Sequence, residues 1–351
     1  MMRILFDGFW WIRGPVSNRQ VMREFVLAWE RQYPDDDMVV AVPAADIELV
    51  RADLPARVRL VATRLRPQGI SAILELPLLA KRLRVDVTLT HNFTPLFGRS
   101  AVFVHDLMFV TNPEWFTRVE LAYFRLMPLT LGRAGWVFTS SETESKRISF
   151  ASGGRRVSPV GLGLSVGLRL ATPTPPPGVE RLDGFLLSVG RLNARKNLGV
   201  AIAAALESGV ATAETPLLVV GEPEGKAAAL GSVTAEAVSA GVVRFLGFLS
   251  DGELAWLYAR ARVFLFLSRD EGFGMPTLEA AAFGAPIVAS DIPVFREILG
   301  DLARFAAPDD IEMTAEAIRA AFGAGRASAV DVEQMGYSWE LSVRRIRGEL
   351  T

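Results

Sequence analysis

The chain has 351 residues, enough for two domains of ordinary size, each with its own hydrophobic core. Half of the residues are hydrophobic and 22% are charged, a balance typical of a folded globular protein and not of a disordered one. The formal net charge of -1 excludes a global basic field that would attract nucleic acid. Cysteine is absent, which excludes disulfides, thiolate zinc sites and cysteine nucleophiles, and two histidines are too few for an imidazole metal cluster.

Short apolar runs alternate with amphipathic segments along the first half of the chain. We expect strands at RILF, MVVAV, VRLVAT, VDVTLT, AVFV and WVFTS, in that order. The segment SNRQVMREFVLAWERQ between the first two is predicted to be a helix, because Val21, Phe25 and Trp29 share one face. Its Ser17 and Gln20 have the spacing of a capping box. Strand and helix alternation predicts a mostly parallel sheet with helices on both faces.

The alternation stops at ATPTPPPGVERLDG, where four prolines oppose a helix or a central strand and favour a semi-rigid linker. It resumes with the apolar runs FLLSV, PLLVV, VVRFLG, VFLFLS and PIVAS, and Ser250 with Glu253 marks a second capping box. The sequence therefore predicts an α/β protein with an N-terminal Rossmann-like domain at 1–170, the linker at 171–184, a C-terminal Rossmann-like domain at 185–335 and a terminal amphipathic helix at 336–351.

The expected location is cytoplasmic. No apolar run approaches the roughly 20 residues of a membrane-spanning helix, and the chain opens on RILFDG in place of a secretory signal pattern. Arginines and lysines gather between residues 51 and 84, and NPEWFTRVELAYFRLMPLTLGR mixes arginine with aromatic residues. Two interpretations stay open for these segments: solvated helix faces, or a peripheral contact with the anionic inner surface of a membrane.

The stretch RDEGFGMPTLEAAAFGAPIVASD places Glu271 and Glu279 on either side of a Gly-Phe-Gly turn and a helix start. The turn follows the buried run VFLFLS, so free backbone amides point beyond the end of that strand and form an anion site with the helix dipole. Gly272 and Gly274 let the main chain approach a ligand closely. Because two acids would repel a phosphate, we expect them to accept hydrogen bonds from sugar hydroxyls.

The segment SVGRLNARKN places Arg191 and Lys196 in the turn after FLLSV. Two cations at that sheet edge could neutralise a diphosphate without a metal. Acids for hydroxyls and cations for phosphates together predict a nucleoside diphosphate sugar as ligand. A hydride-transfer enzyme would need a glycine fingerprint that LFDGFWWIRG lacks. The segment GEPEGK, residues 221–226, has the wrong spacing for a phosphate loop, so we expect a plain strand-to-helix turn.

These motifs resemble the retaining glycosyltransferases of the GT-B fold, family 4, also called glycosyl transferases group 1. The resemblance is carried by the two segments quoted above together with RFLGFLSDGELAWLYARARVFLFLS and YSWELSV. It is strongest from residue 185 to 300. It implies two Rossmann-like domains facing a central cleft, with the last helix crossing back to the N-terminal domain. It also implies metal-independent, retaining transfer of a sugar from a nucleotide-diphosphate donor to a glycan, lipid-linked or small-molecule acceptor. A relative that hydrolyses or epimerises the nucleotide sugar, or a non-catalytic binding protein, is the alternative, and the donor base and sugar stay open.

The resemblance implies a role for each motif residue. Arg191 and Lys196 would hold the diphosphate, Glu271 the sugar hydroxyls and Glu279 the ribose. His105, after the run AVFV, would contact the donor sugar and stabilise the oxocarbenium-like charge; a histidine buried in the core is the alternative. The other expected donor-binding residues are Gly14, Gly190, Gly247, Phe248, Leu249, Gly272, Phe273, Gly274, Met275, Thr277 and Leu278.

The acceptor is expected to bind to the first half of the chain. Trp10 and Trp11 could stack on a sugar ring or pack into the core. His91 and Asn92, after another strand, are further candidates for lining the cleft, with a structural role as the alternative. Asp106 would orient His105 or its loop.

Overall fold

The computed structural model describes residues 1–222 and 232–351, which form two compact units. The first unit comprises Met1–Pro113, Arg118–Gly163 and Gly336–Thr351, and the second comprises Glu114–Thr117 and Leu164–Met335. The last four residues of GEPEGK lie outside the described residues, so the turn expected there stays a prediction. In the described ranges no helix has the length and apolar character needed to cross a bilayer.

The first unit is built on a seven-stranded parallel sheet with the order β3-β2-β1-β4-β5-β6-β7. The strands are β1 Arg3–Asp7, β2 Asp37–Pro43, β3 Arg59–Thr63, β4 Val87–His91, β5 Ser100–Phe103, β6 Trp136–Thr139 and β7 Ser158–Pro159. All but β7, whose two residues carry no apolar run, coincide with the predicted strands. The strand order reverses between β1 and β4, which makes the carboxyl ends of these two strands a topological switch point.

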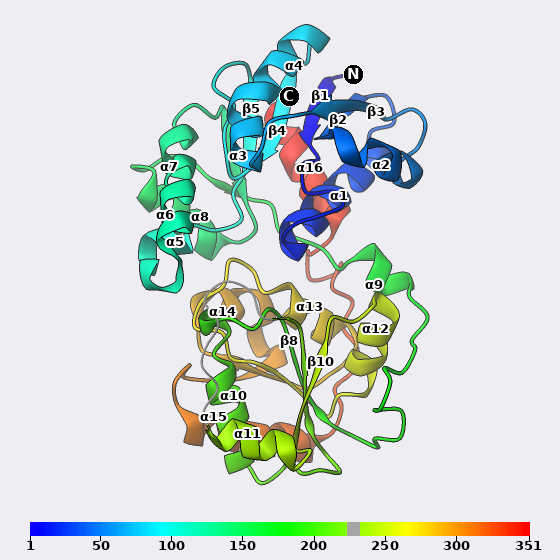
Figure 1. Cartoon of the computed structure of the whole chain (residues 1–351), viewed down its shortest axis with the longest axis vertical. Coiled ribbons are helices and arrows are strands. Elements are labelled where there is room, and N and C mark those ends of the chain that lie inside the picture. Colours follow the sequence, from blue (N-terminus) through cyan, green and yellow to red (C-terminus); the bar gives the residue numbers. More distant parts are fainter. Residues whose placement is uncertain (223–231) are drawn as a thin grey trace. The chain divides into compact units, whose positions relative to one another are not determined.

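Helices cover this sheet (Figure 1). They are α1 Val16–Gln32, α2 Ile47–Asp53, α3 Gln68–Ile70, α4 Leu76–Leu83, α5 Met108–Thr111, α6 Arg118–Phe124, α7 Leu126–Leu131, α8 Glu142–Ala151 and α16 Trp339–Leu350. Helix α1 buries Phe25 and Trp29, as its pattern predicts. The capping box predicted at Ser17 is wrong: Pro15 occupies the cap position without a side-chain cap, and the helix already begins at Val16, because proline presets the backbone for a helix start.

The terminal helix α16 belongs to the first unit, where it packs along α1, as Figure 1 shows for the red and blue helices. The Trp339 ring meets the Phe25 ring edge-on at 5.7 Å between centroids. The buried Asp36 carboxylate accepts hydrogen bonds from Arg347 Nε at 2.8 Å and from Trp29 Nε1 at 3.2 Å. The prediction that the last helix returns to the N-terminal domain is therefore confirmed.

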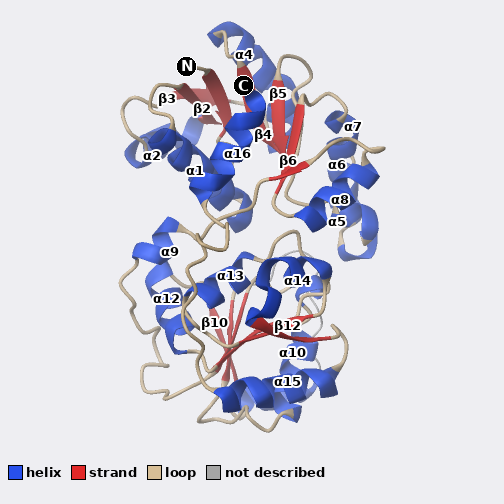
Figure 2. Ribbon diagram, turned by 180° about the vertical axis from the view of Figure 1, so that it is seen from behind, coloured by secondary structure: helices blue, strands red, loops and turns tan. Residues whose placement is uncertain are grey.

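The second unit has a six-stranded parallel sheet with the order β10-β9-β8-β11-β12-β13, drawn in red in the lower half of Figure 2. Its strands are β8 Leu186–Val189, β9 Leu217–Val220, β10 Val243–Gly247, β11 Val263–Phe266, β12 Ile287–Ser290 and β13 Ala303–Ala306. Its helices are α9 Val166–Leu170, α10 Leu198–Glu207, α11 Ser232–Ser239, α12 Asp251–Arg260, α13 Met275–Ala282, α14 Pro293–Leu299 and α15 Ile311–Ala324. The strand order reverses between β8 and β11, the second switch point.

Two features of the second unit bear on its predicted boundaries. The capping box at the start of α12 is confirmed, since Ser250 accepts from Glu253 N and the Glu253 carboxylate accepts from Ser250 N. The unit begins at Leu164 and not after residue 170, because α9 buries Leu168 beside α12. The proline-rich segment is tied to the same helix, where Thr174 N donates to Gly252 O at 3.0 Å.

The bond between Arg347 and Asp36 leads to a prediction about stability. Substituting Arg347→Leu leaves a buried carboxylate with one charged partner fewer, which should cost about 3 kcal/mol of unfolding free energy in the first unit. Arg344→Leu, an exposed position on the same helix, should have almost no effect. Urea unfolding followed by circular dichroism measures both. Equal midpoints for the two variants would contradict this account of how α16 is held.

Candidate functional site

The switch point of the second unit brings together the two motifs singled out in the sequence. The loop after β8 carries Arg191 and Lys196, and the loop after β11 carries Glu271. Strands β8 and β11 are parallel neighbours, so their carboxyl ends lie at one edge of the sheet. Doubly wound sheets bind ligands in the crevice beyond such ends.

Glu271 is held between two cations of the β8 loop. Lys196 Nζ lies 2.6 Å from Glu271 Oε1, and Arg195 Nη1 lies 2.5 Å from Glu271 Oε2. Arg195 also joins the two loops twice more, through its Nη1 to Asp270 O at 3.1 Å and through its carbonyl, which accepts from Arg269 N at 2.9 Å. The sequence interpretation missed Arg195, although its position beside Lys196 in ARKN was a usable signal.

Burial and charge set the protonation of this pair. Burial opposes ionisation of Glu271, but Arg195 and Lys196 outweigh it and lower its pKa to about 2. Burial lowers the pKa of Lys196 to about 8, with Glu271 acting in the opposite direction. The Lys196 ammonium also lies 4.3 Å from the centroid of the Phe266 ring. At neutral pH the site therefore holds an ionised carboxylate and a lysine that is still mostly protonated.

The turn before α13 is shaped by glycine. Gly274 caps the helix with φ 91°, and its carbonyl accepts from both Thr277 N and Thr277 Oγ1, at 2.9 and 2.8 Å. A Cβ on Gly274 would come within 2.7 Å of the Phe295 ring, so no larger residue fits. Phe273 is buried beside it. Pro276, the second helical residue, has no N–H, and Thr277 N is bound to Gly274 O, so Met275 supplies the amide at the start of α13.

Backbone packs tightly on the other side of the β8 loop. Gly190 has φ 149°, and a Cβ on Gly221 would lie 2.0 Å from the Gly190 carbonyl oxygen. Gly247, with φ 68°, accepts from Gly221 N at 2.9 Å. After it, the Phe248 side chain is 68% exposed whereas Leu249 is buried. The predicted Gly190 and Gly247 thus lie at turns that the strand ends require.

Glu279 lies on α13, where Tyr258 of α12 donates a hydrogen bond to its Oε2 at 2.8 Å. Desolvation raises the pKa of Glu279 to about 7, against the lowering effect of that bond. Tyr258 is fully buried, and burial and the neighbouring carboxylate raise its pKa well above the ordinary value. Tyr258 was not predicted as a site residue, because its partner is far away in sequence.

The first unit places a second polar cluster at its own switch point. Asp7 ends β1, and its Oδ2 accepts from Gln68 Nε2 at 2.6 Å. The same Gln68 nitrogen donates to the carbonyl of His91, the last residue of β4, at 3.1 Å. Burial raises the pKa of Asp7 to about 6, although the bond from Gln68 lowers it. Neither Asp7 nor Gln68 was predicted.

The two histidines meet at this edge. His105 Nε2 lies 3.0 Å from His91 Nδ1, and the rings are nearly parallel, with 11° between their planes. His105 is partly exposed whereas His91 is 1% exposed. Asn92 has φ 59°, and its side-chain oxygen accepts from His105 N at 3.0 Å. His91 and Asn92 thus support His105 structurally, which was the alternative interpretation of both.

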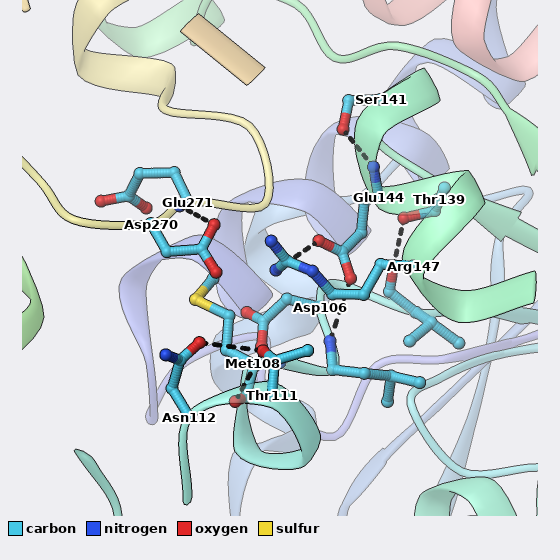
Figure 3. A network of polar contacts seen from close by, with 12 residues as sticks. Asp106, Met108, Thr111, Asn112, Thr139, Ser141, Glu144, Arg147, Asp270 and Glu271 are labelled. Atoms are coloured by element: carbon cyan, nitrogen blue, oxygen red, sulfur yellow. Dashed lines mark hydrogen bonds and ion pairs between the residues drawn. The ribbon is translucent and has the colours of Figure 1, made fainter. Parts of the chain in front are cut away.

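Asp106 and Glu144 hold the loop that follows His105 (Figure 3). Asp106 Oδ1 accepts from Met108 N at 3.2 Å. The fully buried Glu144 accepts from Leu107 N and from Arg147 Nη1, both at 3.0 Å. The start of α8 that carries Glu144 is capped by Ser141 (Figure 3).

The two tryptophans in the loop after β1 differ in their burial. Trp11 is 2% exposed and its indole donates to Asp53 Oδ2 at 3.1 Å, so it packs in the core and is not available for stacking on an acceptor. Trp10 is partly exposed. A Cβ on Gly14 would lie 2.1 Å from the Trp10 ring, so Gly14, predicted near the donor phosphate, leaves room for that ring.

Comparison with known proteins agrees with this architecture. The glycosyl transferases group 1 family matches residues 178–329, which include both loops of the second switch point. The chain is 34% identical over 131 residues to O-antigen chain mannosyltransferase B of Escherichia coli and 29% identical over 234 residues to an O-antigen chain mannosyltransferase of Salmonella typhimurium. These matches cover 37% and 66% of this chain, and 34% and 64% of the length of the two relatives.

A solved structure extends the likeness to the whole fold. The Anabaena protein HepE, crystallised with UDP and glucose, superposes with a TM-score of 0.68 at 18% identity, covering 100% of this chain and 99% of that one. The two Rossmann-like units, each with a parallel sheet, are those of the GT-B fold. Within the second unit, residues 178–329 match the glycosyl transferases group 1 family.

Proposed function

We propose that this protein is a glycosyltransferase that moves a hexose from a nucleoside diphosphate sugar to a hydroxyl group of a glycan acceptor. The observation that carries the proposal is the meeting of Lys196, Arg195 and Glu271 at the β8–β11 switch point. Diphosphate needs fixed cations and sugar hydroxyls need a carboxylate, and this edge offers both. The family match and the mannosyltransferase relatives support it, and they favour mannose as the sugar and an O-antigen-type polysaccharide as the product.

The proposed donor position follows from the chemistry of each group. Arg191, Lys196 and the Met275 amide at the start of α13 bind the diphosphate, Glu271 accepts hydrogen bonds from the sugar, and Glu279 accepts them from the ribose. When Lys196 turns to the phosphate, Arg195 stays on Glu271 and keeps that carboxylate ionised. We assign His105 of the first unit to the transferred sugar, because it follows β5 and so lies at the carboxyl edge of its sheet.

We propose a retaining mechanism in which the leaving phosphate oxygen takes the acceptor proton. Glu271 is a poor base for this step, because its two cationic neighbours lower its pKa to about 2. Lys196 and Arg191 stabilise the negative charge that develops on the diphosphate, the task that a divalent metal performs in other transferases. The reaction proposed here is therefore independent of added metal.

We also propose that the first unit makes a peripheral contact with an anionic membrane, where a lipid-linked acceptor would lie. Leu78 of α4 is 61% exposed and Phe97 is 45% exposed, and the Phe97 loop is bound to the segment before α4 through Leu96 N and Ile73 O. The end of α4 adds cations to this apolar surface; they are Lys81, Arg82 and Arg84. Exposed apolar side chains with neighbouring cations favour an anionic lipid surface.

The proposed activity is tested by incubating the protein with GDP-mannose and UDP-glucose, each with and without an O-antigen-type oligosaccharide acceptor, in the presence of EDTA. We expect a glycosylated product only when the acceptor is present and no loss of rate with EDTA. Release of free sugar without an acceptor would favour a hydrolase. Loss of activity in EDTA that Mg²⁺ restores would contradict the metal-independent mechanism.

The raised pKa of Glu279 predicts that donor binding depends on pH. Only its ionised form accepts hydrogen bonds from both ribose hydroxyls, so with a pKa of about 7 the affinity for a nucleotide sugar should rise between pH 6 and pH 8. The expected increase is about fivefold, since the ionised fraction of Glu279 grows about tenfold while about half of Lys196 loses its proton by pH 8. Above pH 8 the affinity should fall as Lys196 loses its proton.

Calorimetry without an acceptor measures this effect, and Glu279→Gln is the matched control. It should abolish the rise below pH 8 and keep the fall above it. A rise that persists in Glu279→Gln would mean that another group binds the ribose.

The membrane contact predicts that the protein co-sediments at physiological salt with vesicles containing anionic phospholipid. The pair of substitutions Leu78→Asp and Phe97→Asp should reduce the bound fraction several-fold. Phe150→Asp, which alters an exposed side chain of α8, should leave it unchanged. If the unaltered protein does not appear in the vesicle pellet, the proposed membrane contact is wrong.

A further inference from the structure

The geometry of the two imidazoles at the β1–β4 switch point indicates which nitrogen of each ring carries a proton. His91 Nδ1 and His105 Nε2 are 3.0 Å apart, a hydrogen-bond distance, so one of these nitrogens holds the proton and the other accepts it. Because the ring planes differ by only 11°, the bond can run close to both planes, where the N–H and the lone pair point. Which ring donates decides which hydrogen-bonding atom His105 offers to a ligand.

The surroundings of His91 answer that question. Burial and the neighbouring His105 lower its pKa well below the ordinary value, so it is neutral and has a single N–H. Its Nε2 is buried and has no hydrogen-bond partner among the residues that the structure describes. A proton on Nε2 would be an unsatisfied buried donor, which proteins avoid more strictly than an unsatisfied acceptor. The proton therefore belongs on Nδ1, which has His105 Nε2 as its acceptor.

The backbone fixes both rings in place. Asn92 N donates to Phe103 O at 2.9 Å and the Asn92 side chain accepts from His105 N, which joins the end of β4 to the end of β5. The Phe103 ring meets both imidazoles edge-on, with centroids at 6.3 Å from His91 and 5.1 Å from His105. From the other side, Gln68 holds the His91 carbonyl and the Asp7 carboxylate together. These bonds fix the backbone that carries both rings, and the Phe103 ring packs against each imidazole.

We propose that His91 is a positioning residue that fixes His105 as the neutral tautomer with its proton on Nδ1. Nε2 of His105 accepts a hydrogen bond from His91 Nδ1–H. A proton on His105 Nε2 would therefore place two N–H groups opposite each other. The N–H of His105 is then on Nδ1, where it can donate to a hydroxyl or carbonyl oxygen of a ligand. The role of this N–H in sugar transfer rests on the proposed function; the tautomer itself does not.

The tautomer can be observed directly, because the chain has only two histidines. In ligand-free protein labelled with ¹⁵N-histidine, long-range nitrogen–proton correlation at pH 7.5 identifies the protonated nitrogen of each ring. We expect Nδ1 to be protonated and Nε2 unprotonated in both residues. A proton on Nε2 of His105 would overturn the proposal, whether or not the protein transfers sugar.

Two variants test the effect on the reaction. His91→Phe keeps a ring but removes the donor, so His105 should become a mixture of tautomers and kcat should fall roughly tenfold with KM little changed. His91→Asn can present an amide N–H near the position of Nδ1 and should restore most of kcat and the single tautomer. If His91→Phe transfers sugar at the unaltered rate, the positioning role is refuted. If the unaltered protein shows the expected tautomer but no transfer, the proposed function fails and the tautomer assignment stands.

Discussion

The contact of Glu271 with Lys196 and Arg195 is the constraint on which the second unit depends. It joins the loop after β8 to the loop after β11, and it keeps three charges at the edge of an otherwise apolar sheet. A buried lysine or glutamate alone would be costly, whereas the group of three has nearly balanced charge. The two cations exceed the single carboxylate by one positive charge, so the ligand-free site attracts an anion.

Both units use their topology in the same way. Each sheet reverses its strand order once between neighbouring parallel strands, and at each reversal the polar residues come from loops that are distant in sequence. In the second unit these groups are cations, an acid and a helix start, which suit a diphosphate and a sugar. In the first unit they are a buried acid, an amide and two imidazoles in place of lysine and arginine, and these groups suit hydroxyls. The division of labour that we propose between donor and acceptor follows from this difference in charge.

Much of the fold could be predicted from the sequence because the apolar runs are short, regular and well separated. The strands RILF to WVFTS and FLLSV to PIVAS all form, and Ser250 caps its helix as its spacing indicates. Local geometry overruled the pattern where proline was involved: Pro15 starts α1 before Ser17 can cap it. Strands β7 and β13 were missed because neither has a continuous apolar run.

The site was predictable only where one segment carries several functional residues. The spacing of Glu271 and Glu279 around a glycine turn led to the edge that the structure shows to be polar. Tyr258, Gln68 and Asp7 were missed because each contacts its partner across a long stretch of chain, and no local pattern records such a contact. For Trp11 the core alternative holds, since a tryptophan in a loop can still be buried.

The central claim is that fixed cations at the β8–β11 edge bind the donor diphosphate. The most direct measurement is calorimetric titration of the protein with GDP and UDP, comparing Lys196→Ala with Lys146→Ala, which alters an exposed lysine of the first unit. Loss of a charged hydrogen bond to phosphate should weaken binding by at least about tenfold in Lys196→Ala, and Lys146→Ala should match the unaltered protein. Equal affinity in all three proteins, with circular dichroism showing each one folded, would contradict the account.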